Sequence, residues 1–144
     1  MAALSADRQT KSKGVGDVFS YPVKASTTIY KGAMVMLIKS STGAGYLEPA
    51  TDATNRACVG VADEQVDNSS GADGALSCRV ISGRHFAFAV SGALTAATNG
   101  QQISPADDQT VKPFNQGIGG MQTRFTSTSE CWVFIPTASL GLHS

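Results

Sequence analysis

A chain of 144 residues, 42% of them hydrophobic, is long enough to bury the core of one domain of ordinary size. Its 11 basic and 11 acidic residues give a net charge of zero, whereas proteins that bind nucleic acid usually carry a basic excess. No segment approaches the roughly 20 consecutive apolar residues of a helical membrane span. The composition therefore argues against nucleic acid and membrane as partners.

The charge is sparse and unevenly spread. Only 15% of the residues are charged, so uncharged polar side chains must cover much of the surface, which suits contact with other proteins. Residues 1–31 carry five basic and two acidic side chains, whereas residues 48–73 carry six acidic and one basic. These are either solvated loops or a basic N-terminal arm that docks on the acidic surface of a neighbour, such as another copy of the chain.

Residues 1–16 are polar and glycine-ended, which predicts a flexible N-terminal arm, either disordered or ordered only on a partner. After the arm, short apolar runs separated by Gly, Asn, Asp and Ser predict about ten strands. They cover residues 18–23, 33–39, 46–47, 57–62, 76–81, 86–90, 102–104, 110–114, 118–125 and 131–135. A short helical turn is predicted at 94–99.

These strands predict an all-β fold, a single-domain sandwich or barrel, jelly-roll-like, with the β domain at 17–138 and a C-terminal tail at 139–144. The runs at 76–81 and 86–90 alternate apolar and small or polar residues on either side of a Ser-Gly-Arg turn. We expect them to form a hairpin.

The three cysteines, Cys58, Cys78 and Cys131, each lie in an apolar, strand-like run. Because cysteine packs as a small hydrophobe, we expect three buried free thiols rather than disulfides. Free thiols agree with assembly in a reducing cytoplasm. The wide spacing of these residues, without a CxxC pair, does not suit a zinc site.

Catalytic signals are weak. His85 opens a strand, and a triad with Ser82 and Asp63 can be drawn, but no nucleophile motif supports it. The adjacent pairs Asp63–Glu64 and Asp107–Asp108 suit turns better than acid–base chemistry. We therefore predict no catalytic residues.

A calcium loop is the strongest form of an acidic-site hypothesis. Asp63, Asp67, Asn68 and Asp73 surround a glycine-containing loop, although their spacing does not match an EF-hand. We therefore predict no metal and no cofactor.

Aromatic residues near the basic segment are candidates for partner contacts, because interface hot spots favour aromatic side chains. The terminal strand around Trp132 is apolar on both faces, which is typical of a central strand or of one that a neighbouring subunit covers. The predicted partner-binding residues are Lys11, Lys13, Phe19, Tyr21, Lys24, Tyr30 and Trp132.

The order of several short motifs carries a resemblance. They are Tyr-Lys-Gly-Ala-Met-Val at 30–35, Ala-Cys-Val-Gly-Val-Ala-Asp-Glu at 57–64, an acidic loop at 68–74, the strands at 80–92, an alanine-rich step at 96–103, Ile-Gly at 118–119 and Trp-Val-Phe-Ile at 132–135. Residues 30–136 in this order resemble the small capsid cement, or head decoration, proteins of tailed bacteriophages, which are often described only as a domain of unknown function.

The resemblance implies a β module on the outside of the virion head that clamps adjacent major capsid protein subunits. It implies no catalytic residues, assembly in the host cytoplasm, and association with its own copies as a dimer or trimer. Residues 1–29 lie outside the resemblance. The alternative is a β-sandwich binding module for carbohydrate or a cell surface, in a phage fibre or tail, and a small hydrolase is a third hypothesis.

Overall fold

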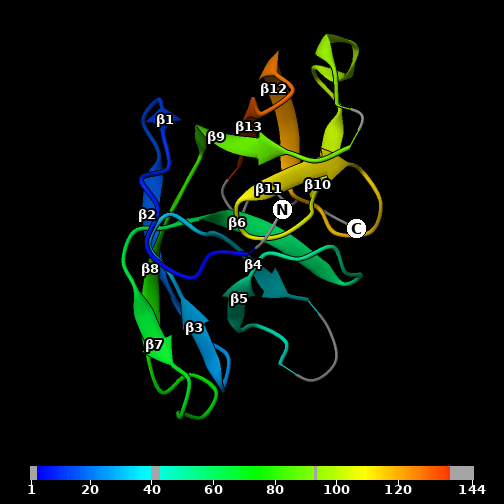
Figure 1. Ribbon diagram of the computed structural model, residues 1–144. Helices are drawn as coiled ribbons and strands as arrows, with labels where there is room; N and C mark the ends of the chain where they lie inside the picture. The colour runs from blue at the N-terminus through cyan, green and yellow to red at the C-terminus, as the bar shows by residue number, and fades with distance from the viewer. Residues whose placement is uncertain (1–2, 40–42, 93, 137–144) are drawn as a thin grey trace.

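The computed structural model describes residues 3–39, 43–92 and 94–136, and this part of the chain folds as one small all-β domain (Figure 1). The predicted all-β sandwich or barrel is confirmed. Each of the ten predicted strands is present, the helical turn is a short 3₁₀ turn, η1 (Ala96–Thr98), and three short strands were not predicted. The strands are β1 (Ser12–Lys13), β2 (Asp17–Pro22), β3 (Thr27–Ile29), β4 (Met34–Ile38), β5 (Leu47–Pro49), β6 (Arg56–Ala62), β7 (Val66–Asn68), β8 (Ser77–Ser82), β9 (Arg84–Val90), β10 (Gln102–Pro105), β11 (Thr110–Pro113), β12 (Gly120–Ser127) and β13 (Glu130–Ile135).

Five strands close into a small barrel in the upper half of Figure 1. They follow the order β9–β11–β10–β12–β13, and β13 pairs back with β9 to close the ring. The β9–β11 pair is parallel, whereas the other barrel pairs are antiparallel. Strand β1 adds to β9 outside the ring.

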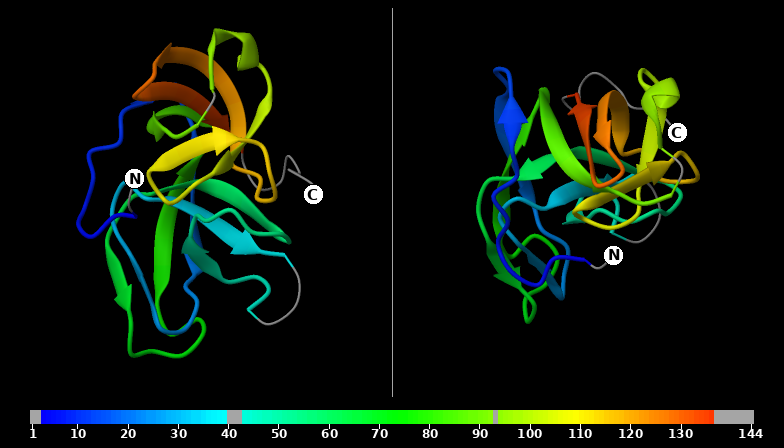
Figure 2. Two further views of the ribbon diagram at one scale, coloured as in Figure 1. Left: turned by 45° about the vertical axis from the view of Figure 1, so that its right-hand side comes forward. Right: turned by 45° about the horizontal axis from the view of Figure 1, so that its top comes forward.

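A five-stranded sheet of order β2–β8–β6–β4–β5 lies below the barrel, with the β3–β7 ribbon at the far end (Figures 1 and 2). A bulge between Val35 and Met36 of β4 leaves Val59 of β6 without a partner. The next residue, Gly60, has φ of +152°, and a Cβ there would lie 2.1 Å from the Ile81 carbonyl oxygen. The close approach of β6 and β8 therefore requires glycine at this position.

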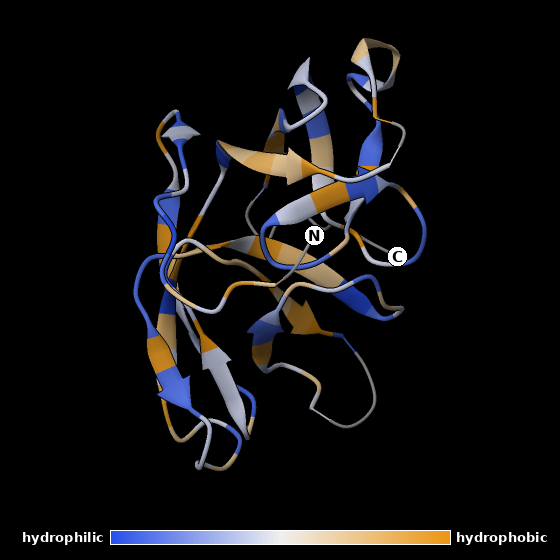
Figure 3. Ribbon diagram, viewed as in Figure 1, coloured by the Kyte–Doolittle hydropathy of each residue, from blue (hydrophilic) through white to orange (hydrophobic). Residues whose placement is uncertain are grey.

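The core has two parts, one on each face of β4 and β6. Met34, Met36 and Cys58 pack toward the barrel, and Val35 and Val59 pack toward the ribbon side. Both faces are covered, which explains why these strands are continuously apolar in the sequence. Figure 3 shows the apolar stretches on β4 and β6 between the two halves.

The three cysteines are buried and unpaired, as predicted from the sequence. Burial raises the pKa of the Cys58 thiol far above its usual range. Burial likewise raises the pKa of Cys78 to about 12 and that of Cys131 to about 11. All three are therefore protonated, unreactive thiols at neutral pH.

The predicted hairpin of 76–81 with 86–90 is wrong. Strand β8 belongs to the open sheet and β9 to the barrel, and no pairing joins them. The chain bends once at Gly83, where φ is +73° and the amide donates to the Ile135 carbonyl oxygen at 2.7 Å. The two strands thus continue one another from one half of the molecule into the other, and β2 and β1 run antiparallel beside them.

The N-terminal segment lies against the domain. The Leu4 amide donates to Asp108 Oδ1 at 2.8 Å, the Arg8 guanidinium to the Ala87 carbonyl at 3.2 Å, and Thr10 Oγ1 to the Gly32 carbonyl at 2.6 Å. The sequence places 1–16 outside the β domain as a flexible arm. The described part of it is hydrogen-bonded to that domain, and its flexibility in solution stays a prediction. The tail at 139–144 lies outside the described residues.

Candidate functional site

A pocket of about 190 Å³ opens on the outer face of the barrel, beside β1. It is lined by Lys13, His85, Thr123, Arg124 and Trp132. Pairing explains why these residues meet: Lys13 is opposite His85 on β9, and Trp132 is opposite Arg124 on β12. Because β13 also pairs with β9, four strands from distant parts of the sequence converge here.

Two cationic side chains, Lys13 and Arg124, flank an indole at this pocket. The Lys13 ammonium lies 4.8 Å from the centroid of the Trp132 ring, a cation–π contact. Both cationic side chains are exposed, and no ion pair with a carboxylate is found for either within the described part of the chain. The pocket therefore presents net positive charge beside an aromatic surface.

His85 forms one wall of the pocket and is held in place from two sides. Its Nδ1 lies 2.9 Å from Thr123 Oγ1, and its ring centroid lies 5.0 Å from that of Phe134. A fixed imidazole, an indole and two free cationic groups can bind a carboxylate or another polar planar group.

Exposed apolar side chains also occur along β2 and just before it, on both faces of the strand. Val15 is 94% exposed, and Val18 and Phe19 on β2 are 51% and 52% exposed. Leu76, next to the β2–β8 pair, is also exposed. We call β2 with Val15 the β2 edge. An exposed edge strand with apolar side chains is a common place for another chain to bind.

The structure brings together some of the predicted partner-binding residues. Lys13 and Trp132 share the pocket, and Lys11 lies close by, with its ammonium 2.7 Å from Glu130 Oε2. Phe19 and Tyr21 lie on one face of β2 along the same edge.

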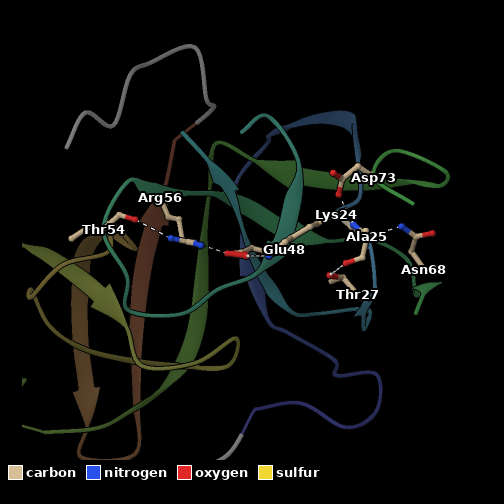
Figure 4. Close-up of polar contacts among 8 residues, drawn as sticks. All are labelled: Lys24, Ala25, Thr27, Glu48, Thr54, Arg56, Asn68 and Asp73. Carbon is tan, nitrogen blue, oxygen red and sulfur yellow. Dashed lines mark hydrogen bonds and ion pairs between the residues drawn. The ribbon is translucent and has the colours of Figure 1, made fainter. Parts of the chain in front are cut away.

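Lys24 and Tyr30 lie apart from the pocket. The Lys24 ammonium is 3.8 Å from Glu48 Oε1, and Glu48 Oε2 also accepts from Arg56 Nε at 2.7 Å (Figure 4). Tyr30 is half-buried before β4. Lys24 therefore serves an internal ion-pair network that bridges β5 and β6.

Sequence reasoning did not single out Thr123 or Arg124, and it treated His85 only as a weak catalytic candidate. Their role depends on closure of the barrel by the β9–β13 pair. The sequence at 118–125 gives no sign of which strands lie beside it, and a register shift between Gln122 and Arg124 brings the adjacent residues Thr123 and Arg124 to the same pocket.

Ser82, His85 and Asp63, which can be drawn as a triad that no sequence motif supports, have different partners in the structure. The hydrogen-bond partner of His85 is Thr123, Ser82 is buried, and Asp63 lies 3.8 Å from the Arg79 guanidinium. The three residues thus serve separate local contacts.

The acidic side chains of the loop at 63–73 make separate local hydrogen bonds. Asp73 Oδ1 accepts from the Ala25 amide at 2.8 Å, and Asp67 Oδ1 accepts from Ser69 and Thr28. Asn68 is buried, and its amide nitrogen donates to backbone carbonyls. Within 3–39, 43–92 and 94–136, no three His, Cys, Asp or Glu side chains gather as metal ligands. In the same ranges no helix has the length and apolar character to span a bilayer.

Comparison of the chain with protein-family models, with curated proteins and with solved structures returns no match.

Proposed function

We propose that this protein is a non-enzymatic structural protein of a phage virion, which binds the outside of the head and cements adjacent major capsid protein subunits. The observation that carries this proposal is the positively charged aromatic pocket around Lys13, Arg124 and Trp132, next to the exposed apolar β2 edge. Aromatic and cationic anchors beside apolar surface are what a protein partner with acidic residues requires.

The order of motifs over 30–136 supports the choice of partner through its resemblance to capsid cement proteins. The physical task also suits the fold. A head filled with DNA is under outward stress, and a module that touches two or more subunits adds buried surface at each contact. A standard interface of about 1,600 Å² is sufficient for one contact. Simultaneous binding to several subunits raises the effective affinity without a single strong site.

Co-sedimentation with purified, undecorated heads tests the proposal. We expect saturable binding of the wild-type protein and a higher temperature of head disruption. We expect Lys13→Glu to weaken binding by about tenfold or more, because it reverses a charge that faces an acidic partner. Arg124→Glu is expected to act in the same direction.

Lys31→Glu is the matched control, since it makes the same charge change at an exposed residue outside this pocket. We expect this variant to bind heads as the wild-type protein does. Absence of wild-type binding with the protein folded, or equal loss in Lys13→Glu and Lys31→Glu, contradicts the proposal.

The same pocket favours a second candidate function, binding of an acidic carbohydrate. An indole shelf with cationic neighbours suits a sugar ring that carries a carboxylate. Trp132 is the only tryptophan of the chain, so its fluorescence reports directly on the pocket. A saturable fluorescence change on titration with uronic-acid oligosaccharides, together with no head binding, favours this function. Wild-type head binding without a fluorescence response favours the cement function.

A further inference from the structure

Strand β2 is the edge of the five-stranded sheet and pairs only with β8 among the described strands. Its residues are largely exposed. An edge strand carries unpaired backbone groups, which proteins normally protect with charge, bulges or cover. Asp17 is its only charged residue, and Val18 and Phe19 are each about half exposed.

The register shows which backbone groups of β2 are free. The Arg79 carbonyl accepts from the Asp63 amide, and Ile81 is opposite Val61. The backbone N–H and C=O groups of Arg79 and Ile81 in β8 therefore point toward β6. Backbone groups of alternate residues point to opposite sides of a strand. The backbone groups of Cys78, Val80 and Ser82 therefore point toward β2.

The partners of these β8 residues on β2 are Tyr21, Phe19 and Asp17. In an antiparallel ladder, opposite residues that face each other exchange hydrogen bonds, so the remaining residues of β2 point outward. The amide of Val23, two residues beyond Tyr21, donates to the Leu76 carbonyl at 2.9 Å, which continues the same alternation.

Val18, Ser20 and Pro22 thus direct their backbone groups away from the sheet. Pro22 has no N–H, and at this outward position its ring removes no bond from the β2–β8 ladder. The free groups are the amides of Val18 and Ser20 and the carbonyls of all three residues. This row can pair with another strand.

We propose that two copies of this chain associate through their β2 edges, antiparallel, about a two-fold axis at Phe19. In this register, Val18 of each copy faces Ser20 of the other, so both outward amides of each copy find a carbonyl. Phe19 meets Phe19 at a non-hydrogen-bonded position, where side chains lie closest. Pro22 falls opposite Gly16, at the margin of the pairing. The two five-stranded sheets then join into one.

Charge complementarity favours a second copy as the occupant. Antiparallel pairing about Phe19 directs the basic end of each edge, at Lys13, toward residue 25 of the other copy. Asp73 lies at that place, because its carboxylate accepts from the Ala25 amide, and Lys24 is paired with Glu48 (Figure 4). Because the net charge of the chain is zero, two copies do not repel each other through net charge.

The two-fold arrangement also uses one surface twice, as the commonest homodimers do. The uneven charge of the sequence, basic in 1–31 and acidic in 48–73, then has a structural role. This inference concerns the purified chain by itself and does not require the head-binding proposal.

Sedimentation velocity of the full-length protein over a wide concentration range tests the dimer. We expect a monomer–dimer equilibrium that salt weakens, because the charged ends are exposed. Amide hydrogen exchange by NMR provides the specific readout: the Val18 and Ser20 amides exchange more slowly at high than at low concentration. A monomer at all concentrations, a trimer, or unchanged exchange at Val18 and Ser20 overturns the proposal.

Ser20→Pro and Ser20→Ala form a matched pair of variants. Proline at this position removes an outward amide and leaves the β2–β8 ladder intact, so we expect the dimer dissociation constant to rise by about thirtyfold or more. Ser20→Ala keeps the amide and is expected to dimerise as the wild-type protein does. A folded Ser20→Pro variant that dimerises normally overturns the proposal.

Val18→Lys is a second probe if Ser20→Pro does not fold, because it places like charges near the axis and keeps every amide. We expect it to be monomeric, and normal dimerisation overturns the proposal. Dimerisation is measured without heads, so its failure and the failure of head binding are separate results.

Discussion

Asp52 ties the loop between β11 and β12 to the rest of the molecule. One carboxylate oxygen accepts from the Gln116 and Gly117 amides, each at 2.9 Å, and the other from Asn115 Nδ2 at 2.7 Å. The Lys112 ammonium also lies 2.7 Å from this carboxylate. Sequence reasoning did not single out this aspartate, because its partners lie about sixty residues further along the chain.

Because of Asp52, we expect the folding stability of the protein to fall at acid pH. Partial burial raises its pKa, but hydrogen bonds from Lys112, Asn115 and the two amides outweigh burial and hold the pKa well below its usual range. The folded pKa is below the unfolded value, so the stabilisation is present above the unfolded pKa and is lost as the pH falls through the folded pKa. We expect this loss from about pH 5 downward, measured by urea unfolding at several pH values.

Asp52→Asn is the variant that isolates this effect. We expect its free energy of unfolding to be lower than that of the wild-type protein by about 1–3 kcal/mol at neutral pH. We also expect the variant to lose less stability on acidification than the wild-type protein does. Asp17→Asn serves as the control, since Asp17 is exposed on β2. An equal acid response in the wild-type protein and Asp52→Asn contradicts this assignment.

At the scale of the elements, the sequence predicts the strands well and their partners poorly. Alternation in 86–90 and the continuous apolar run at 33–39 correspond to β9 and β4, because a strand's side chains report how its two faces are covered. The short strands β3 and β7 have three residues each, too few for a periodic signal. The Ser-Gly-Arg sequence at 82–84 predicts a hairpin turn, whereas the chain only bends at Gly83, since a turn residue alone does not show whether the chain reverses.

The candidate site shows the same division. The sequence predicts Lys13 and Trp132 because a basic segment and a terminal strand that is apolar on both faces are recognisable in it. It does not predict Arg124, since only closure of the barrel brings β12 and β13 beside β9 and β1. Chemistry that depends on residue type was predictable, whereas chemistry that depends on long-range pairing was not.

Gly60→Ala tests the close approach of β6 and β8. Alanine would place a methyl group against the Ile81 carbonyl and force the backbone from φ of +152°. We expect a loss of about 2–4 kcal/mol in the free energy of unfolding, because the sheet must open or the bulge must move. Thermal and urea unfolding measure this loss.

Gly45→Ala is the control, since its φ is also positive but no atom lies within 4 Å of the added Cβ. It isolates the cost of backbone strain from that of the clash. Equal losses in the two variants would mean that the contact with Ile81 contributes nothing.

At the scale of the whole molecule, the barrel and the open sheet share one continuous path. The β8–β9 path crosses from the sheet into the barrel, and β1 and β2 follow it on the outside (Figure 2). The N-terminal segment adds contacts to both halves: Leu4 packs against the ribbon-side core, and the Arg8 guanidinium lies 5.6 Å from the Phe88 ring centroid. This segment therefore contacts both halves, and we expect it to act as a strap that holds them together.

Deletion of residues 1–13 distinguishes a strap from a flexible arm. The truncation removes the hydrogen bonds to Asp108, Ala87 and Gly32 and exposes the edge of β9. At about 1 kcal/mol for each of these three bonds, and with the β1–β9 pairing lost in addition, we expect a loss of about 3–5 kcal/mol in the free energy of unfolding, measured by thermal and urea unfolding.

Val15→Ser is the control for the truncation, because this side chain is almost fully exposed and its substitution is expected to leave stability within about 0.5 kcal/mol. An unchanged unfolding curve for the truncated protein would mean that the segment is the flexible arm that the sequence predicts. In that case, head binding lost on truncation is lost through direct contacts of the arm. If the segment is a strap, we expect the truncation to lower both stability and head binding. Head binding falls because the truncation removes Lys13 of β1, which lines the pocket together with residues of the barrel.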